Sequence, residues 1–175
     1  MQTSAISLTV ASPADAESIA RLHAQSWRNA YRGMLADEYL DRHVVADRLE
    51  FWNARFATVP PDRRLVLQAI GDGTLMGFVC VLLDAEPQWG ARLDNLHASP
   101  ESKGTGIGYM LFQTAREWLA SMSPGTAMHL WCVERNHVAR RFYDRQGGKI
   151  VETATRPVAQ ELAVPELRYW WPPLR

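Results

Sequence analysis

Apolar and polar residues alternate along the chain with two periods, which predict strands and helices. Apolar residues recur at every second position from Ile6 to Val10, as in a short strand. Beyond Ser12, which suits a helix N-cap, they recur at helical spacing, and Gly33 is expected to end this helix. One face of the helix then carries Ile19, Leu22, His23, Ser26, Trp27 and Ala30.

The segments that follow combine two helices with a hairpin. A short and a long helix are expected at Asp37–Asp41 and Val44–Thr58. After a Pro-Pro break, strands are predicted at Leu65–Ile70 and Leu75–Leu83, and the Gly-Asp-Gly turn between them predicts an antiparallel hairpin. A third strand is expected over Trp89–Ala98.

The C-terminal part continues to alternate between the two periods. It is expected to form a helix, a strand, a helix and two strands, at Ile107–Met122, Ala127–Val133, Asn136–Gln146, Lys149–Thr153 and Gln160–Trp171. Because strands and helices are mixed along the whole chain, the sequence predicts an α/β fold with a mixed sheet, in one domain over residues 1–175.

The composition narrows the class of protein. The 175 residues suffice for one domain with a full core, and 19 basic residues balance 19 acidic ones. Proteins that bind nucleic acid or anionic membranes in bulk usually carry net positive charge, so neither partner is expected. No segment resembles a membrane span or a signal peptide, which favours a cytoplasmic protein.

Two features indicate a structural role rather than catalysis or metal binding. Cys80 and Cys132 lie in apolar runs, where buried free thiols are expected instead of a disulfide or a metal site. The aromatic run Tyr169-Trp170-Trp171 is expected either to pack within its strand or to form the contact of a homodimer, and the sequence leaves both open.

The strongest chemical signal is a glycine-rich turn between a strand and a helix. Gly104, Gly106 and Gly108 precede or open the helix, where free backbone N–H groups and a partial positive charge favour an anion. Glycine lets the anion approach closely, and phosphate is the usual one. Since Lys103 precedes the glycines, the spacing is not that of a P-loop, and Gly-x-Gly-x-Gly is not the dinucleotide fingerprint. A glycine-rich connection without a ligand is the structural alternative.

Two blocks of the sequence resemble motifs of the GCN5-related N-acetyltransferases, the GNAT family. Leu-His-Ala-Ser-Pro-Glu-Ser-Lys-Gly-Thr-Gly-Ile-Gly, from Leu96 to Gly108, is similar to motif A, with Lys103 where the family usually has Gln or Arg. The block from Leu130 to Gly148 is similar to motif B, through Asn136, Ala139, Phe142, Tyr143 and Gly147. The resemblance spans nearly the whole chain and implies a mostly antiparallel sheet of about seven strands, whose central parallel strands splay apart.

The resemblance implies acetyl-coenzyme A as co-substrate and no metal. Its pyrophosphate would lie at the glycine turn and its pantetheine arm along the end of the preceding strand. The residues implied are Leu96, His97, Ala98, Lys103, Gly104, Thr105, Gly106, Ile107, Gly108, Tyr109, Asn136 and Ala139. A primary amine of a small molecule or peptide would attack the thioester, whose carbonyl is polarised by a backbone N–H near Leu96.

The resemblance also implies two proton-transfer groups. Tyr143 matches the tyrosine that the family places near the sulfur as general acid, and packing in the core is the alternative. The Glu that the family often uses as base aligns with Arg92, which cannot accept a proton. Asp94 is expected on the same face of a regular strand and is the candidate base, with His97 or a water chain as alternatives.

The acceptor amine is expected over the first two helices, as in members of the family. Trp27 and Tyr31 are the candidate substrate-binding residues there, because aromatic rings hold apolar groups or cations. Trp27 also continues the apolar face of its helix, which favours a core position. Two other functions stay open: transfer of a longer acyl group, and a non-catalytic regulatory module that binds coenzyme A.

Overall fold

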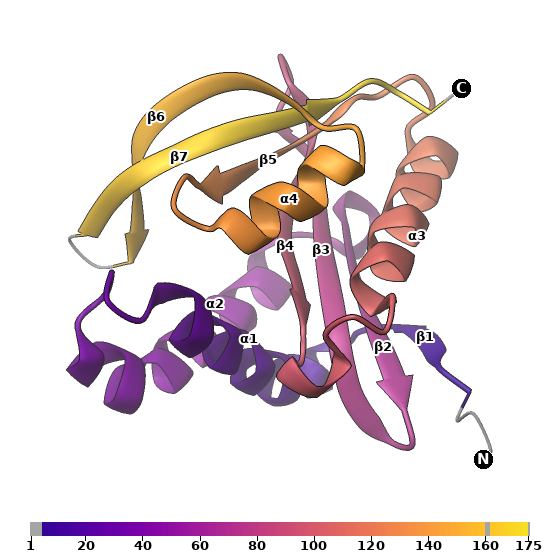
Figure 1. Ribbon diagram of the computed structural model, residues 1–175. Helices are drawn as coiled ribbons and strands as arrows, with labels where there is room; N and C mark the ends of the chain where they lie inside the picture. Colours follow the sequence, from indigo (N-terminus) through magenta and orange to yellow (C-terminus); the bar gives the residue numbers. More distant parts are fainter. Residues whose placement is uncertain (1–4, 160–161, 175) are drawn as a thin grey trace. The chain divides into compact units, whose positions relative to one another are not determined.

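A computed structural model describes residues 5–159 and 162–174 (Figure 1). Its helical elements are η1 Pro13–Asp15, α1 Ala16–Tyr31, η2 Tyr39–His43, α2 Val44–Thr58, η3 Pro61–Arg63, η4 Pro100–Ser102, α3 Ile107–Met122 and α4 His137–Arg145. Its strands are β1 Ser7–Val10, β2 Arg64–Gly71, β3 Thr74–Glu86, β4 Gly90–Ala98, β5 Met128–Val133, β6 Lys149–Ala159 and β7 Leu162–Trp171. Gln160, the predicted start of the last strand, lies outside the described residues.

The strands form a seven-stranded sheet in the order β1-β2-β3-β4-β5-β7-β6. The pairs β1–β2, β5–β7 and β6–β7 are antiparallel, whereas β4 and β5 are parallel. Among the described residues, the parallel register joins only Ala91 to Met128 and Arg92 to His129. The predicted fold class, a mixed and mostly antiparallel sheet in an α/β protein, is confirmed, and the short parallel register agrees with the predicted splay.

The chain divides into two compact units whose boundaries fall within β3, β4 and α3. The first unit contains Met1–Val81 and Asn95–Ala115, and the second contains Leu82–Asp94 and Arg116–Arg175. The glycine turn and α1 therefore belong to the first unit, while Asp94 and Tyr143 belong to the second. A single domain over residues 1–175 stays a prediction.

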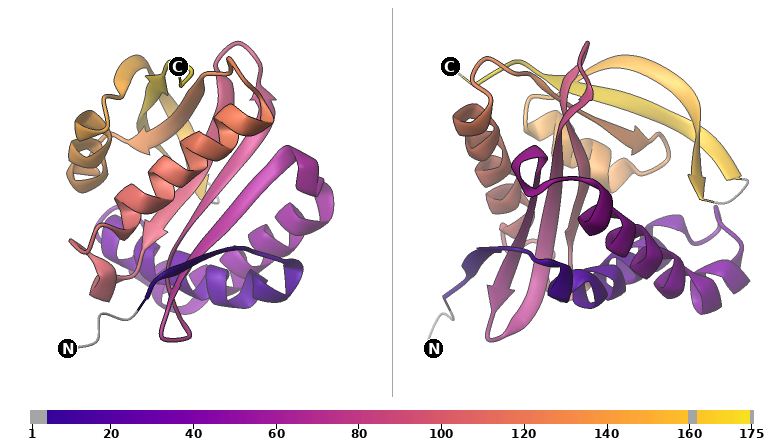
Figure 2. Two further views of the ribbon diagram at one scale, coloured as in Figure 1. Left: turned by 90° about the vertical axis from the view of Figure 1, so that its right-hand side faces the viewer. Right: turned by 180° about the vertical axis from the view of Figure 1, so that it is seen from behind.

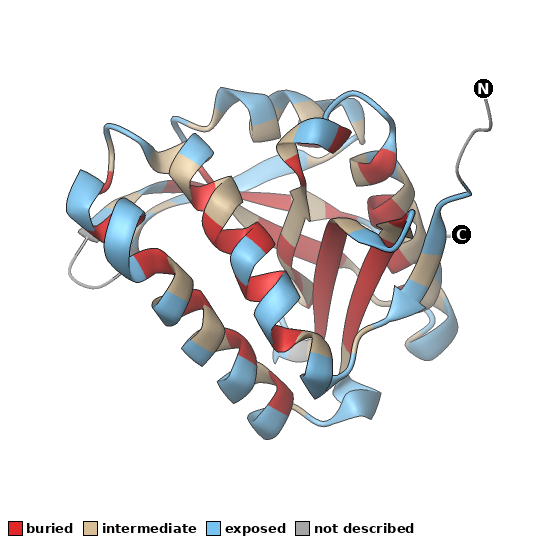
Figure 3. Ribbon diagram, turned by 90° about the horizontal axis from the view of Figure 1, so that it is seen from below, coloured by how far each residue is buried: buried red, intermediate tan, exposed pale blue. Residues whose placement is uncertain are grey.

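In the first unit, helices lie on both faces of the strands (Figure 2). The helices α1 and α2 turn their buried residues toward one face and their exposed residues outward (Figure 3). On that face, the ring of Phe78 in β3 lies 5.3 Å from Trp52 and 5.8 Å from His23. A side chain at the neighbouring Gly77 would instead meet Ile107 and Leu111 of α3. Successive residues of β3 thus face different helices, as the pleat of a strand requires.

In the second unit, β6 and β7 form a long curved ribbon, and α4 lies against β5 and β7 (Figure 1). The rings of Tyr143, Tyr169 and Trp171 make this core: Tyr143 is 5.6 Å from Tyr169 and 5.9 Å from Trp171. The indole of Trp171 donates to the carbonyl of Gln146 at 2.9 Å. Tyr169 and Trp171 are buried, so strand packing accounts for these two members of the aromatic run.

The ends of two predicted elements differ from the structure. The helix Val44–Thr58 has the predicted bounds, but the short helix expected at Asp37–Asp41 does not end at Asp41. It continues through the π-helical residues Tyr39–His43 into α2, because neither Gly nor Pro interrupts the stretch. β6 extends past the predicted Thr153 to Ala159, since it pairs with β7 over its length and shifts register near Pro157. A proline is tolerated there because β6 is the last strand of the sheet.

Other expectations concern the interior and the membrane. Cys80 and Cys132 are buried free thiols, as predicted. Within the part of the chain that the structure describes, no helix is long and apolar enough to cross a membrane. Over the same residues, no group of His, Cys, Asp and Glu side chains is arranged to hold a metal ion.

Candidate functional site

The glycine turn links the end of β4 to the start of α3. Ser99 anchors the chain after β4: its N–H donates to the carbonyl of Met76 at 2.8 Å, and its hydroxyl accepts from the N–H of Ser102. Gly104 and Gly106 then adopt φ values of 80° and 88°, which side-chain-bearing residues rarely adopt. A Cβ at either position would meet no atom within 4 Å. The glycines are therefore needed for the backbone conformation, and the space beside them is open to a ligand.

The other predicted coenzyme A residues of the first unit differ in exposure. Lys103 and Tyr109 are exposed, and Thr105 donates its hydroxyl to the carbonyl of Ser102 at 2.7 Å. Ile107 is 1% exposed, so its side chain anchors α3 in the core and only its backbone can face a ligand. The predicted pantetheine-pairing residues end β4 and are partly exposed: Leu96, His97 and Ala98. Their contact with coenzyme A stays a prediction, as it does for Gly108 in the first turn of α3.

His97 lies in a cluster of rings with His23. The two imidazole centroids are 4.5 Å apart, and His97 Nδ1 lies 2.9 Å from the hydroxyl of Ser26. Burial, helped by the positive charge of Arg48, lowers the pKa of His97 to about 4. His97 is therefore neutral near pH 7, and as the alternative base it would be a weak one.

The sequence predicts only that His23 lies on a helix face. The structure shows that its imidazole is buried and accepts a hydrogen bond. It is 1% exposed, and burial, then His97 and Arg48, hold its pKa well below the ordinary value. The indole of Trp52 donates to His23 Nδ1 at 3.1 Å, so neutral His23 carries its proton on Nε2. A ring nitrogen on an otherwise apolar face is the signal that could have drawn attention to it.

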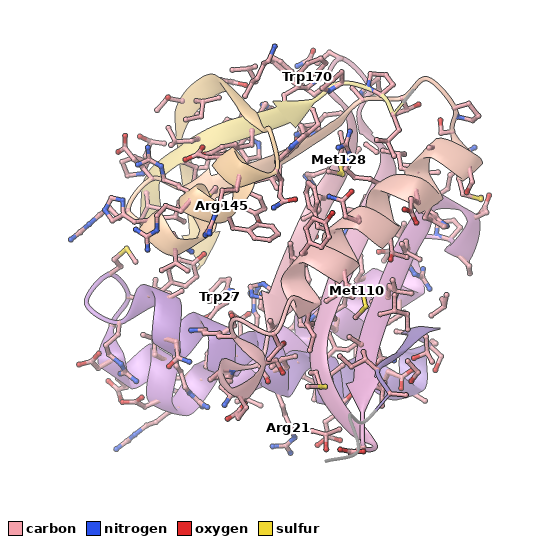
Figure 4. The ribbon with its side chains drawn as sticks, turned by 45° about the vertical axis from the view of Figure 1, so that its right-hand side comes forward. Arg21, Trp27, Met110, Met128, Arg145 and Trp170 are labelled. Carbon is pink, nitrogen blue, oxygen red and sulfur yellow. The ribbon has the colours of Figure 1, made fainter. Side chains whose placement is uncertain are left out.

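The candidate acceptor residues belong to the same unit. Trp27 is 6% exposed, as its interpretation as a core residue requires, and it leaves α1 on the side away from the exposed Arg21 (Figure 4). The ring of Trp27 lies 5.1 Å from that of Tyr31 and 4.1 Å from the guanidinium carbon of Arg48. Arg48 carries no sequence signal of a site, because an arginine on a helix is ordinarily solvated. Acceptor binding by Trp27 and Tyr31 stays a prediction.

In the second unit, α4 carries the predicted acid. Tyr143 is 8% exposed and packs on Tyr169 and Trp171, so the structure shows the packing role, while proton transfer by Tyr143 stays a prediction. The side-chain oxygen of Asn136 accepts from the N–H of Ala139 at 3.1 Å and thus caps α4. Coenzyme A binding by Asn136 and Ala139 also stays a prediction.

The candidate base lies beside an arginine. Asp94 Oδ1 is 3.0 Å from Arg92 Nε, so the two side chains share a face of β4, as expected for a regular strand. Arg92 is also 3.8 Å from Glu86. The residue at the position of the family's Glu thus forms an ion pair with the residue proposed to replace it, and the role of Asp94 as base stays a prediction.

Glu86, which lies near Arg92, also pairs with Arg168, a buried arginine of the second unit. Arg168 is 5% exposed and lies 2.8 Å from Glu86 and 2.7 Å from Glu152. It also donates to His129 Nδ1 at 3.0 Å, which places the proton of neutral His129 on Nε2. Burial lowers the pKa of His129 to about 4, against the opposing effect of Glu86. This cluster carries no sequence signal, since its members come from different strands.

Comparison with known proteins identifies relatives. The model of the acetyltransferase (GNAT) family matches residues 18–148. The Mycobacterium tuberculosis protein named "Probable N-acetyltransferase Rv2775" is 27% identical over 146 residues, which cover 83% of this chain and 81% of that protein.

Solved structures share the fold. The PaiA N-acetyltransferase of Thermoplasma acidophilum, in complex with coenzyme A, superposes with a TM-score of 0.75 at 21% identity, over 95% of this chain and 99% of that one. The Salmonella typhimurium protein YncA, solved with its cofactor acetyl-CoA, gives a TM-score of 0.69 at 15% identity, over 98% of this chain and 96% of that one.

Proposed function

The chain belongs to the acetyltransferase (GNAT) family, and we propose that it transfers an acetyl group from acetyl-coenzyme A to a primary amine of a small molecule or peptide. The observation that carries this proposal is the glycine turn, with Gly104 and Gly106 in the left-handed region immediately before α3. Relatives of the same fold have been solved with coenzyme A or acetyl-CoA, which supports the choice of ligand.

The turn fits a pyrophosphate in three respects. The 16 residues of α3 give a helix whose first N–H groups and dipole favour an anion. The positive φ of both glycines turns the backbone, and a Cβ at either would meet open space, so an anion can approach the main chain. Lys103, exposed beside the turn, adds a positive charge but lacks the fork of an arginine.

The proposed chemistry is direct transfer. Acetyl-coenzyme A supplies a thioester; the amine nitrogen forms a bond to the acetyl carbon, the C–S bond breaks, and coenzyme A leaves as the thiol. The backbone of Leu96, His97 and Ala98 would hold the pantetheine arm as a neighbouring strand does, and an N–H near Leu96 would polarise the carbonyl. Asp94, His97 or water would take the amine proton, and Tyr143 would protonate the sulfur.

Calorimetric titration with acetyl-coenzyme A tests the proposed ligand site. Alanine disfavours the left-handed conformation of Gly106, so the free turn relaxes away from it and binding must restore it; we expect about tenfold weaker binding, equivalent to about 1–2 kcal/mol. Gly125→Ala is the matched control, because Gly125 has a φ of 80° and the same open surroundings in the turn after α3. Equal affinity of the Gly106 and Gly125 variants would remove the turn from the site.

A thiol-release assay, added to the calorimetric titration, distinguishes the two alternative functions. Binding of acetyl-coenzyme A without thiol release from a panel of amines would favour the non-catalytic module, for which the Arg92–Asp94 ion pair at 3.0 Å is the supporting observation. Faster thiol release from a longer acyl-coenzyme A would favour the alternative donor.

A further inference from the structure

Arg48 in α2 is a buried cation whose hydrogen-bonding capacity is only partly used. Its residue is 9% exposed, and its NH2 group lies 3.1 Å from Asp47 Oδ2. Among the described residues, none accepts a hydrogen bond from its buried Nε. A guanidinium has five N–H donors, and a buried donor without a partner is costly. The unused donor therefore indicates an anionic partner that is not part of this chain.

Aromatic rings determine how such a partner can approach. The guanidinium carbon of Arg48 lies 4.1 Å from the ring centroid of Trp27 and 4.9 Å from that of Phe51. Because rings contact the guanidinium, a polar partner can reach only its edges. There, parallel N–H groups form a fork. A carboxylate matches this fork with two hydrogen bonds.

The charge at Arg48 suits a single additional negative charge. Asp47 already lies against the guanidinium, so a doubly charged phosphate would meet a carboxylate of like sign. Asp47 and Phe51, which both contact the guanidinium of Arg48, are partly exposed, so the residues around this cation reach the surface. A monoanionic carboxylate is thus the partner that the site favours.

Ring contacts connect this arginine to the end of β4. Trp27, which contacts Arg48, lies 5.5 Å from His23, and His23 lies 4.5 Å from His97. His97 belongs to the segment proposed to hold the pantetheine arm. A small molecule with its carboxylate on Arg48 could therefore extend an amine toward the segment where the thioester is proposed to lie.

We propose that the acceptor is an amino acid, or a similar small amine that carries a carboxylate, and that Arg48 binds this carboxylate. The proposal rests on the proposed acetyl transfer and adds the chemical class of the acceptor.

Matched acceptor pairs test it. Each common L-amino acid is compared with its amide, which keeps the amine and side chain but lacks the carboxylate. We expect kcat/KM from thiol release to favour the amino acid of the best pair by about 10- to 100-fold, the usual value of a hydrogen bond to a charged group. Calorimetric titration of the same amino acids and amides into the protein saturated with coenzyme A measures acceptor binding independently of turnover.

Three variants assign the effect to Arg48. Arg48→Met keeps the aliphatic stem and should abolish the preference, while Arg48→Lys should keep part of it because it retains the charge without the fork. Arg55→Met is the control: Arg55 lies on the same helix, 5.0 Å from the same Phe51 ring, and its loss should leave the preference unchanged. Thermal melting of each variant verifies that it is folded.

The outcomes distinguish this proposal from the proposed function. Equal use of amino acids and amides by the unaltered protein, or a preference that survives Arg48→Met, would overturn the role of Arg48. Amide turnover without amino acid preference would leave acetyl transfer intact. If no acceptor reacts, calorimetry still decides: carboxylate-dependent binding lost in Arg48→Met supports the site, and absence of binding by every amino acid overturns it.

Discussion

The two buried arginines, Arg48 and Arg168, are held in different ways. Arg168 lies 2.8 Å from Glu86 and 2.7 Å from Glu152, and it donates to His129. Arg48 has Asp47 as its carboxylate partner and, among the described residues, no acceptor at its Nε. Both contact aromatic rings, at 4.3 Å from Trp131 for Arg168 and at 4.1 Å from Trp27 for Arg48. Arg168 is therefore paired with residues of the fold, whereas Arg48 retains a hydrogen-bond donor for a ligand.

Replacing each arginine by Met tests this distinction, and we expect these two substitutions to give the largest difference in the free energy of unfolding. Arg168→Met leaves buried His129 and half-buried Glu86 without this guanidinium, so we expect a loss of about 3 kcal/mol in the free energy of unfolding. Arg48→Met leaves Asp47, which is partly exposed and can be solvated, and should cost about 1 kcal/mol. Urea denaturation followed by circular dichroism measures both losses. Equal losses would contradict the claim that the fold depends more on Arg168 than on Arg48.

Acid titration probes the histidines beside the two arginines. His97 and His129 have pKa values lowered from 6.5 to about 4, so the unfolded chain binds protons first as the pH falls. Each should contribute stability that is full above pH 6.5 and is lost toward pH 4, at most about 3 kcal/mol per residue.

Urea midpoints measured between pH 7 and pH 4 show this loss directly. His97→Gln and His129→Gln should each flatten the pH dependence, and they should do so by similar amounts because the two shifts are alike. A pH dependence unchanged by both substitutions would contradict the assignment of neutral imidazoles in the two clusters.

Removing one carboxylate from each arginine gives the smallest expected effect. Asp47→Asn withdraws the carboxylate from Arg48 and should cost about 1–2 kcal/mol, because a buried charge is left without its ionic partner. Glu152→Gln removes one of two carboxylates from Arg168 and should cost less than about 1 kcal/mol, since Glu152 is 40% exposed and Glu86 remains. Thermal unfolding ranks the two variants, and the reverse order would show that Arg48 does not depend on Asp47.

Sequence alone predicts the parts of this molecule that depend on local spacing. Most of the strands, the glycine turn and the helix that begins near Asn136 follow from periodicity and from residues close together in the chain. The clusters around His23, Arg48 and Arg168 could not be predicted, because their members come from separate elements and meet only after folding. The continuous helical stretch through Tyr39–His43 was missed for another reason: a π-helical turn has no distinctive sequence signal.

Acetyl transfer itself is tested most directly by following both products of one reaction. The protein, acetyl-coenzyme A and the panel of L-amino acids are incubated, thiol release is measured, and the acceptors are analysed by mass spectrometry. We predict one acetyl group gained on an acceptor nitrogen for each thiol released, with a lower rate at limiting acetyl-coenzyme A in Gly106→Ala than in Gly125→Ala. Thiol release without any acetylated amine, across amino acids and their amides alike, would contradict acetyl transfer to an amine.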